Sequence, residues 1–343
     1  MRVDVHQHLW PEQFVAALRR RHAPPCLDGW TLHLDGEPDL AIDPGAHDPL
    51  PRGRLAAADG VDLALVSLSS PLGIEWLPAD EALPLLDAYH DGVAALPPPF
   101  RAWAAACLSD VDPAALRKEL DRGCVGLQLP ATALLDSAGY ARCAPLLDLL
   151  VERDVPLFVH PGAAPARSAA ADSPAGARPS AGADPSVAVG LSSGAGASVV
   201  ADSAAGAGPT DGVDMPAWWA ALVPYVQQLH QAWYAFRAFG RPRHPRLRVC
   251  FAALAGLAPL HNERFAARGG IAGAVDPDIY LETSSYGPRA IDAVVRALAI
   301  DVVVSGSDRP YAGPAEHRLG PAADHALHTA NPQRLLALTG GRP

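Results

Sequence analysis

Four side chains of types that bind metal ions end or follow short apolar stretches far apart in the chain. His6 and His8 flank a glutamine near the start, His160 closes a second apolar stretch, and Asp308 follows a third. In a β-strand, positions i and i+2 share a face at about 6.5–7 Å, so two imidazoles there can reach one cation at about 2.0–2.1 Å. The residue types and their spacing therefore indicate a site for one divalent metal ion.

Each of these residues also has an ordinary structural explanation. A histidine at a strand end is often a surface residue or a hydrogen-bonded core residue, and Asp308 could cap a final helix or turn. It is their joint placement that favours a metal. Asp4 lies two residues before His6, so its side chain should lie on the same face of the strand as those of His6 and His8. We expect it one position deeper in the barrel, where a carboxylate can fix the tautomer of an imidazole.

The elements that must position these residues are predicted as alternating strands and helices. The strand candidates are almost continuously apolar, which is typical of parallel strands covered on both faces. They are 2–6, 62–68, 101–108, 125–129, 156–160, 247–254, 279–283 and 302–305. The helix candidates between them are 81–90, 113–122, 140–153, 218–239, 259–267 and 289–299. Eight such strands favour a (β/α)₈ barrel, or TIM barrel, over a doubly wound sheet, and in a barrel the C-terminal strand ends meet on one face.

One stretch, 163–212, differs from the rest of the chain, which we expect to form a single barrel domain over 1–343. It consists almost wholly of Ala, Gly, Ser, Pro and Asp. Such a segment buries too little apolar surface to offset the entropy lost on ordering. We therefore predict a long disordered insertion after strand five.

Charge and composition narrow the classes of function. The net charge of −10 argues against nucleic acid or an anionic membrane as a partner. The five cysteines are scattered without a Cys-x-x-Cys pair, and neither a signal peptide nor an apolar run of about 20 residues occurs. The glycine-rich phosphate loops and the Gly-x-Ser-x-Gly elbow are absent. These features predict a cytoplasmic protein with reduced thiols and a small-molecule substrate.

Three segments resemble the signature motifs of the amidohydrolase-related family, the branch of the amidohydrolase superfamily that contains aminocarboxymuconate-semialdehyde decarboxylase. They are 3–8 (Val-Asp-Val-His-Gln-His), 158–161 (Phe-Val-His-Pro) and 306–311 (Gly-Ser-Asp-Arg-Pro-Tyr). The resemblance covers nearly the whole chain apart from the insertion. It implies that the four ligand-type residues bind one divalent cation, most often Zn²⁺, with Mn²⁺ as an alternative. It also implies that Asp308 manages the proton of a metal-bound water, whose pKa falls from about 15.7 towards 7, and that the chain forms a homodimer.

The chain departs from this family at one position after strand six. The family carries a histidine there that orients or activates water or the substrate oxygen, whereas this chain has Ala253. Three explanations stay open. Another group, such as His261, takes over the role; or the reaction needs less help, as metal-polarised decarboxylation or lactone opening would; or the barrel is catalytically silent and only binds metal and ligand.

Substrate recognition is predicted for residues at the same rim. Arg309 could pair with a substrate carboxylate in a bidentate fork, Ser69 could hydrogen-bond a ligand, and Trp10 could form part of an apolar wall. With Asp308 as the residue that transfers the proton, the sequence predicts a metal-dependent hydrolase or a carboxy-lyase (decarboxylase). Its substrate would be a small carboxylated molecule, with an aromatic one as an option.

Overall fold

The computed structural model describes residues 1–35, 37–164, 216, 218–271 and 275–338. Residues 1–166 and 217–343 cluster as one compact unit, which contains every helix and strand named below. The predicted insertion, 163–212, falls almost entirely on residues 165–215, which lie outside the described residues. The insertion and the single domain over 1–343 therefore stay predictions.

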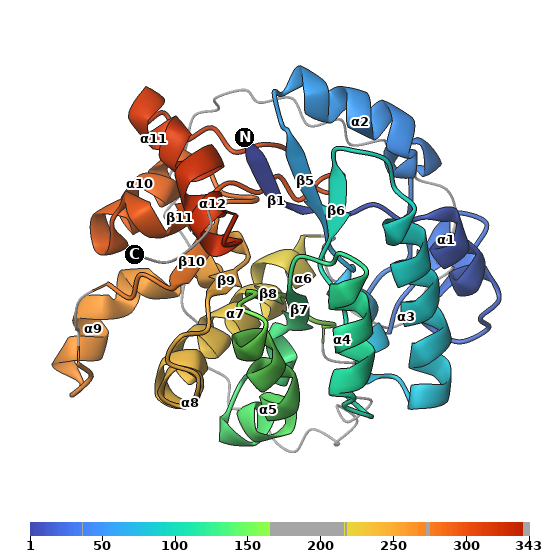
Figure 1. The fold of residues 1–343 in the computed structure, drawn as a ribbon, viewed down its shortest axis with the longest axis horizontal. Coiled ribbons are helices and arrows are strands. Elements are labelled where there is room, and N and C mark those ends of the chain that lie inside the picture. Colours follow the sequence, from blue (N-terminus) through green and yellow to red (C-terminus); the bar gives the residue numbers. More distant parts are fainter. Residues whose placement is uncertain (36, 165–215, 217, 272–274, 339–343) are drawn as a thin grey trace, which may run out of the picture. The chain divides into compact units, whose positions relative to one another are not determined.

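Eight parallel strands close into a barrel in the described part of the chain (Figure 1). They are β1 (Val3–Gln7), β5 (Leu63–Val66), β6 (Phe100–Ala102), β7 (Leu127–Pro130), β8 (Leu157–His160), β9 (Val249–Phe251), β10 (Ile279–Glu282) and β11 (Val303–Val304). Hydrogen bonds join β1, β5 and β6, and also β7 to β11 in sequence order. Two isolated bridges join these groups of strands into a closed ring. Ala104, just after β6, pairs with Leu127 of β7, and Gln7 of β1 pairs with Arg309, after β11. All eight predicted strands are present, so the predicted barrel is confirmed.

Helices cover the outside of the strands (Figure 1). They are α1 (Glu12–Arg19), α2 (Pro49–Ala58), α3 (Ala79–Ala94), α4 (Pro113–Asp121), α5 (Ser137–Glu152), α6 (Trp219–Leu222), α7 (Pro224–Ala235), α8 (Arg241–Arg243), α9 (Asn262–Ala267), α10 (Pro288–Leu298), α11 (Pro321–His325) and α12 (Asn331–Leu335). The start of α4 shows why a helix begins there. The Asp112 carboxylate accepts the backbone N–H of Ala114 at 2.8 Å, and Pro113 takes the first helical position, where its fixed φ suits the helix.

The barrel interior and the layer under the helices are separate apolar clusters. Side chains such as Val5, Trp103, Phe158, Cys250 and Tyr280 fill the interior and are at most 2% exposed. The opposite faces of the same strands pack against the helices. This two-sided burial is the reason that the strand segments are apolar at nearly every position.

A small antiparallel sheet lies between α1 and α2 in the chain and was not predicted. It consists of β2 (Cys26–Asp28), β3 (Thr31–His33) and β4 (Leu40–Ala41). Its strands are only two or three residues long and mix polar with apolar side chains, so neither a period of two nor an apolar run marks them. Leu32 is buried, and the sheet contributes to the wall of the functional site.

The predicted sixth strand, 247–254, ends earlier than expected. The strand β9 stops at Phe251, and five residues in a row, Ala253–Leu257, adopt positive φ angles between 46° and 62°. This left-handed turn costs an L-residue roughly 1–2 kcal/mol per position, so its surroundings must hold it. At Gly256 an added Cβ would lie 2.6 Å from the carbonyl oxygen of Val226 on α7. The close approach of α7 therefore requires glycine.

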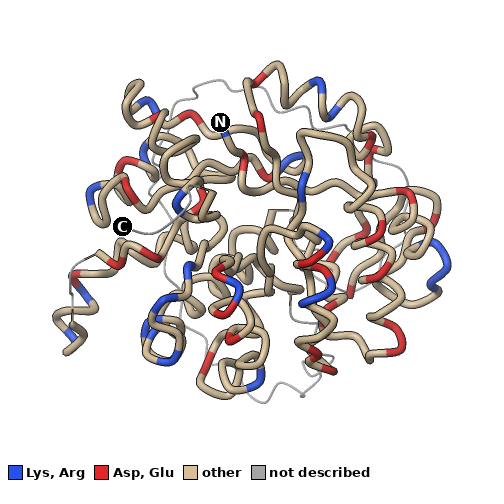
Figure 2. The backbone as a smooth tube through the Cα atoms, in the orientation of Figure 1, with Lys and Arg blue, Asp and Glu red and all other residues tan. Residues whose placement is uncertain are grey.

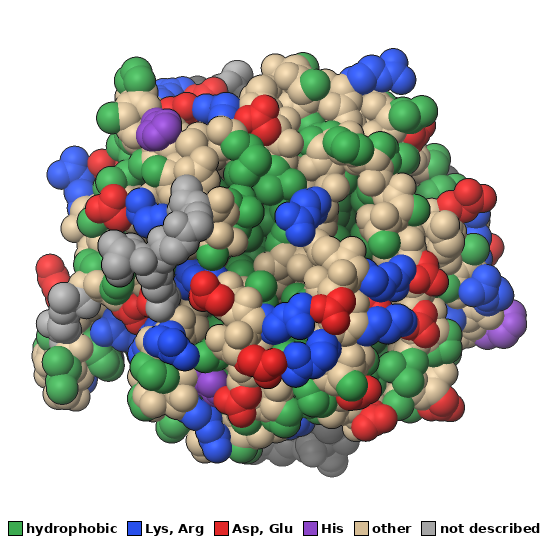
Figure 3. Space-filling view, viewed as in Figure 1, with side chains coloured by type: hydrophobic (Ala, Val, Ile, Leu, Met, Phe, Trp, Pro, Cys, Tyr) green, Lys and Arg blue, Asp and Glu red, His purple; other side chains and the backbone are tan. Residues whose placement is uncertain are grey.

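Charged side chains of both signs are interspersed along the outer helices and loops (Figures 2 and 3). The five cysteines are unpaired thiols. Among the described residues, none of the helices has the length and apolar character needed to cross a membrane.

Candidate metal centre

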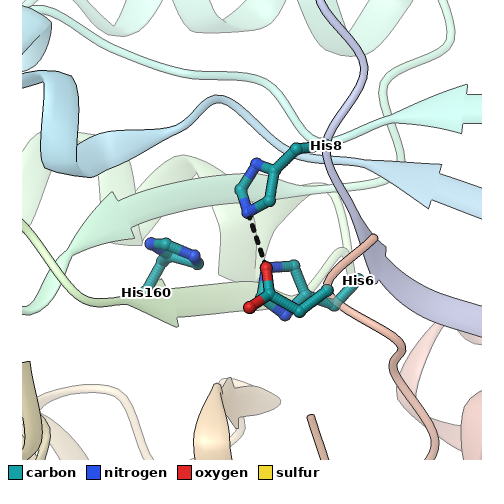
Figure 4. A group of neighbouring side chains, drawn as sticks. His6, His8 and His160 are labelled. Atoms are coloured by element: carbon teal, nitrogen blue, oxygen red, sulfur yellow. Dashed lines mark hydrogen bonds and ion pairs between the residues drawn. The ribbon is translucent and has the colours of Figure 1, made fainter. Parts of the chain in front are cut away.

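The four ligand-type side chains predicted from the sequence converge. His6 lies on β1, His8 directly follows it, His160 is the last residue of β8, and Asp308 lies in the loop after β11. One potential ligand atom from each lies within 4.8 Å of all the others, and the three imidazoles face a common centre (Figure 4). The Nε2 atoms of His6 and His8 are 3.0 Å apart, and Nε2 of His8 is 3.1 Å from Oδ1 of Asp308.

Each imidazole in this group uses its Nδ1 atom to contact an oxygen that can only accept a hydrogen bond. The pairs are His6 with Glu282 Oε2 at 3.0 Å, His8 with Ser67 O at 3.0 Å, and His160 with Pro161 O at 2.8 Å. Because an ionised carboxylate and a carbonyl carry no proton to give, the proton of each neutral imidazole resides on Nδ1. When all three rings are neutral, their Nε2 atoms therefore direct lone pairs towards one another.

This donor set fits a divalent cation. Two nitrogen atoms at 3.0 Å repel each other unless a proton or a metal ion lies between them. Ligands that bind one tetrahedral ion at about 2.0–2.1 Å lie about 3.3 Å from each other, close to the separations in this group. Three imidazoles and one carboxylate are ligands that Zn²⁺ and other divalent transition metals accept.

Burial and charge set the protonation of the group. Burial lowers the pKa of His8, and burial together with the two neighbouring histidines holds the pKa of His160 well below its usual value. For His6 burial also acts to lower the pKa, but the charges of Asp308 and Glu282 outweigh it and the pKa is raised. Burial acts to raise the pKa of Asp308, yet the three imidazoles lower it overall. The site thus favours an ionised carboxylate, the form in which Asp308 can bind a metal.

Glu282 is the carboxylate that orients His6, and it was not predicted from the sequence. Its side chain is fully buried and accepts hydrogen bonds from the backbone N–H of Ala253 at 3.2 Å and from the Ser284 hydroxyl at 2.7 Å. A Cβ at position 306 would collide with it, so Gly306 is required there. Glu282 ends the apolar strand β10 as His160 ends β8, and this shared signal could have identified it.

The prediction that Asp4 orients an imidazole is wrong. Its carboxylate accepts the backbone N–H groups of His6 and Ser307, both at 3.1 Å, and the side-chain amide of Gln7 at 2.7 Å. It therefore ties β1 to the loop that carries Asp308.

Asp308 itself has a strained backbone. Its φ is +55°, a left-handed conformation that is uncommon outside glycine and recurs at functional sites. Its N–H donates to the carbonyl oxygen of His6 at 2.8 Å, and the N–H of Ser307 donates to the same oxygen at 3.2 Å. These bonds fix the aspartate beside the strand that carries the two histidines.

Among the described residues that line the cavity, none is a further histidine that could replace the one missing at position 253. His261 packs its ring against that of His230, at 5.1 Å between centroids, and it is absent from the described residues that line the cavity around the four ligands. The explanation that His261 takes over the role is therefore wrong. Ala253 does line the cavity, and it presents only a methyl group there.

The four side chains open into a cavity of about 410 Å³. Its wall comes mainly from the small antiparallel sheet, the loop after β5, and α6 and α7. The apolar lining residues include Leu32, Leu34, Leu40, Pro71, Leu72, Leu222, Val226 and Leu229. Residues of the small sheet and α7 belong to elements that no ligand motif marks, which is why their part in the site was not predicted.

Of the three residues predicted to bind substrate, two line this cavity. They are Trp10 and Ser69, and the Trp10 indole N–H donates to the Ser69 hydroxyl at 3.1 Å. Arg309 does not line it. Its guanidinium pairs with Asp59 at 2.5 Å, and its backbone carbonyl accepts the N–H of His8. The predicted carboxylate fork at Arg309 is therefore wrong.

Comparison with known proteins places the fold. No protein-family model and no curated protein matches the sequence. The solved structures that match include IDCase from Metarhizium anisopliae, with 14% identity, a TM-score of 0.69, and 98% of this chain and 97% of that chain covered. They also include 2,6-dihydroxybenzoate decarboxylase from Rhizobium, with 18% identity, a TM-score of 0.62 and 99% of each chain covered.

A third match is a variant of 5-carboxyvanillate decarboxylase from Novosphingobium aromaticivorans with bound manganese and 3-methoxy-4-hydroxy-5-nitrobenzoic acid. It has 12% identity and a TM-score of 0.64, and 98% of this chain and 97% of that chain are covered. Such matches over full length establish the fold, a TIM barrel like that of metal-dependent decarboxylases. The resemblance noted in the sequence is confirmed at the level of the fold.

Proposed function

We propose that this chain is a metal-dependent decarboxylase of small aromatic carboxylates. One observation carries the proposal: three bare Nε2 atoms and the Asp308 carboxylate face an apolar cavity whose lining offers only a methyl group at Ala253. Hydrolysis needs a group that activates water, whereas loss of CO₂ needs a polarised carboxylate and a proton donor. The missing histidine at position 253 removes one aid to water activation, while Asp308 remains as a group that can move a proton, so this site favours loss of CO₂.

The metal ligands of this proposal are His6, His8, His160 and Asp308. The donor set favours Zn²⁺, and Mn²⁺ is the alternative, since the structurally similar Novosphingobium enzyme contains it. When bound, the cation supplies Lewis-acid polarisation of the substrate's carboxylate. Trp10 and the aliphatic wall would hold the ring and exclude water.

Asp308 is proposed to move the proton. In the reaction the bond between ring carbon and carboxylate breaks, the electron pair stays on the ring carbon, and CO₂ leaves while that carbon takes up a proton. Because its pKa is lowered, Asp308 is ionised at rest and must first accept a proton, for which a substrate hydroxyl is the source. It then returns this proton to the carbon within hydrogen-bond reach.

The test is metal content together with turnover. The full chain would be purified from cells supplied with Zn²⁺ or Mn²⁺, its metal measured by mass spectrometry, and CO₂ release followed with 2-hydroxybenzoates, alongside lactone and ester hydrolysis. We expect about one ion per chain and CO₂ release only. His160→Asn should lose the metal, and His261→Asn, whose ring lies outside the cavity, should keep both metal and activity.

Other outcomes separate the alternatives. Lactone hydrolysis without CO₂ would contradict decarboxylation and favour a hydrolase. Bound metal without any turnover would favour a catalytically silent barrel. Absence of metal after supplementation would contradict the site itself.

A further inference from the structure

The fixed charges that face the cavity are acidic. Among its described lining residues, Asp308 and Glu37 carry carboxylates and none is a lysine or an arginine. Apart from the three histidines of the metal centre, the remaining described lining residues are apolar or carry a hydroxyl or indole group. A ligand carboxylate therefore finds a positive partner only at the metal centre.

Two arginines near the metal ligands, Arg52 and Arg309, are already engaged. Arg52 is 5% exposed, and its guanidinium donates to the carbonyl oxygens of His8 and Ala46 and to the Gln7 side chain. Arg309 pairs with Asp59. Since neither side chain lines the cavity, neither offers its charge to a bound molecule.

Glu37 reaches the cavity from the segment between β3 and β4. Its Oε1 accepts the hydroxyl of Tyr225 on α7 at 2.6 Å, so the contact joins the small sheet to α7. Burial raises the pKa of Glu37, and the Tyr225 hydrogen bond opposes that rise. A ligand carboxylate placed beside Glu37 would be desolvated without a cationic partner, and it would face a like charge when Glu37 is ionised.

We propose that this cavity selects monocarboxylates with an uncharged, mainly apolar body and rejects dicarboxylates, and that Glu37 determines this specificity. The inference rests on the proposed function, because it places the one accepted carboxylate at the metal centre. The wall of leucines and prolines takes the body of the ligand. A hydroxyl or amino group on that body finds an acceptor in Glu37.

The test compares two ligands that differ at one ring position, 5-methylsalicylate and 5-carboxysalicylate. Binding to the metal-loaded full chain is measured by calorimetry, and CO₂ release from both ligands is measured in parallel. We expect 5-carboxysalicylate to bind at least about tenfold more weakly, the penalty of an unpaired buried charge. Glu37→Gln should narrow this gap at least about threefold by removing the like charge. Asp35→Asn, at an exposed position in the same segment, should leave the gap unchanged.

Equal or tighter binding of 5-carboxysalicylate would overturn the proposal, as would failure of both ligands to bind. An unchanged gap in a folded Glu37→Gln variant would remove Glu37 as its cause. The ligand pair alone tests the selectivity if that variant does not fold. A preserved binding preference with no CO₂ from either ligand would count against decarboxylation and not against the selectivity.

Discussion

Glu282 is the carboxylate that sets the orientation of a ligand ring. It holds Nδ1 of His6 at 3.0 Å, while Nδ1 of His8 contacts the Ser67 carbonyl and the Ser69 hydroxyl and Nδ1 of His160 contacts the Pro161 carbonyl. We expect Glu282→Gln to weaken metal binding by roughly 10–100-fold, the usual effect of losing a carboxylate behind a ligating histidine.

Competition with a chromogenic chelator measures this affinity without relying on activity. Glu263→Gln, at an exposed position on α9, is the matched control and should bind metal like the parent. An unchanged affinity in Glu282→Gln would show that the position of His6 does not depend on this carboxylate.

The four ligand-type residues could be found from the sequence because each ends or follows an apolar strand, and a barrel gathers such positions on one face. Glu282 has the same signal, but its carboxylate was not interpreted as a partner of His6. Glu37 and Tyr225 could not be found, since they come from the small sheet and α7. Where those elements lie depends on tertiary packing that no short motif reports.

Among the elements, the short 3₁₀ turn Ile74–Trp76 after β5 contains an unusual carboxylate. Glu75 is fully buried, and its Oε2 has no hydrogen-bond partner among the described residues. Burial raises its pKa from 4.5 to about 7. Between these two values the folded chain keeps a proton that the unfolded chain releases, so the free energy of unfolding falls as the pH rises through this window.

We expect Glu75→Gln to remove this pH dependence. Relative to the parent, the variant should gain stability between about pH 5 and pH 8, by up to about 3 kcal/mol. Urea unfolding of the metal-free chain at several pH values measures it, with Glu263→Gln as the control whose curve should follow the parent. If the free energy of unfolding varied with pH in the same way for the parent and for Glu75→Gln, the raised pKa of Glu75 would be contradicted.

The left-handed turn after β9 makes a second prediction at this scale. Ala253 has a φ of +46°, where glycine is less strained, so Ala253→Gly should stabilise the chain by about 1 kcal/mol. The same substitution at the exposed Ala115, inside α4, should destabilise it by about 1 kcal/mol. Thermal unfolding measures both changes. A higher melting temperature for Ala253→Gly and a lower one for Ala115→Gly would support the left-handed turn, whereas a lower melting temperature for both variants would contradict it.

The eight barrel strands were predictable because two-sided burial makes them apolar throughout. The left-handed turn was not, since its alanines and leucines are good helix formers and nothing in their types indicates a left-handed backbone. The small antiparallel sheet lacked any periodic pattern because its strands are so short. Local sequence therefore predicted the elements that burial dictates and missed those imposed by their neighbours.

At the scale of the whole molecule, a bound ion would link three separate parts of the chain. Because it binds only the folded state, it should raise the free energy of unfolding by about 4 kcal/mol at a free concentration about a thousandfold above its dissociation constant. We expect the melting temperature to rise by roughly 5–10 °C when the metal-free chain is reloaded. Scanning calorimetry measures the shift, which His160→Asn should lack and His261→Asn should retain.

The homodimer implied by the family resemblance and the cytoplasmic location stay predictions. The first can be checked by the mass of the particle in solution. The selectivity inferred for the cavity also belongs to this scale, because its wall joins the small sheet, α7 and the barrel.

The closure of the barrel has a consequence for biosynthesis. Since β1 is completed by hydrogen bonds to the segment after β11, such as Val5 N–H to Ser305 O at 3.0 Å, the first barrel strand cannot be fully paired until the last one has been made. His6 and His8 precede Asp308 by most of the barrel. A nascent chain therefore cannot assemble the complete ligand set until the segment after β11 has left the ribosome.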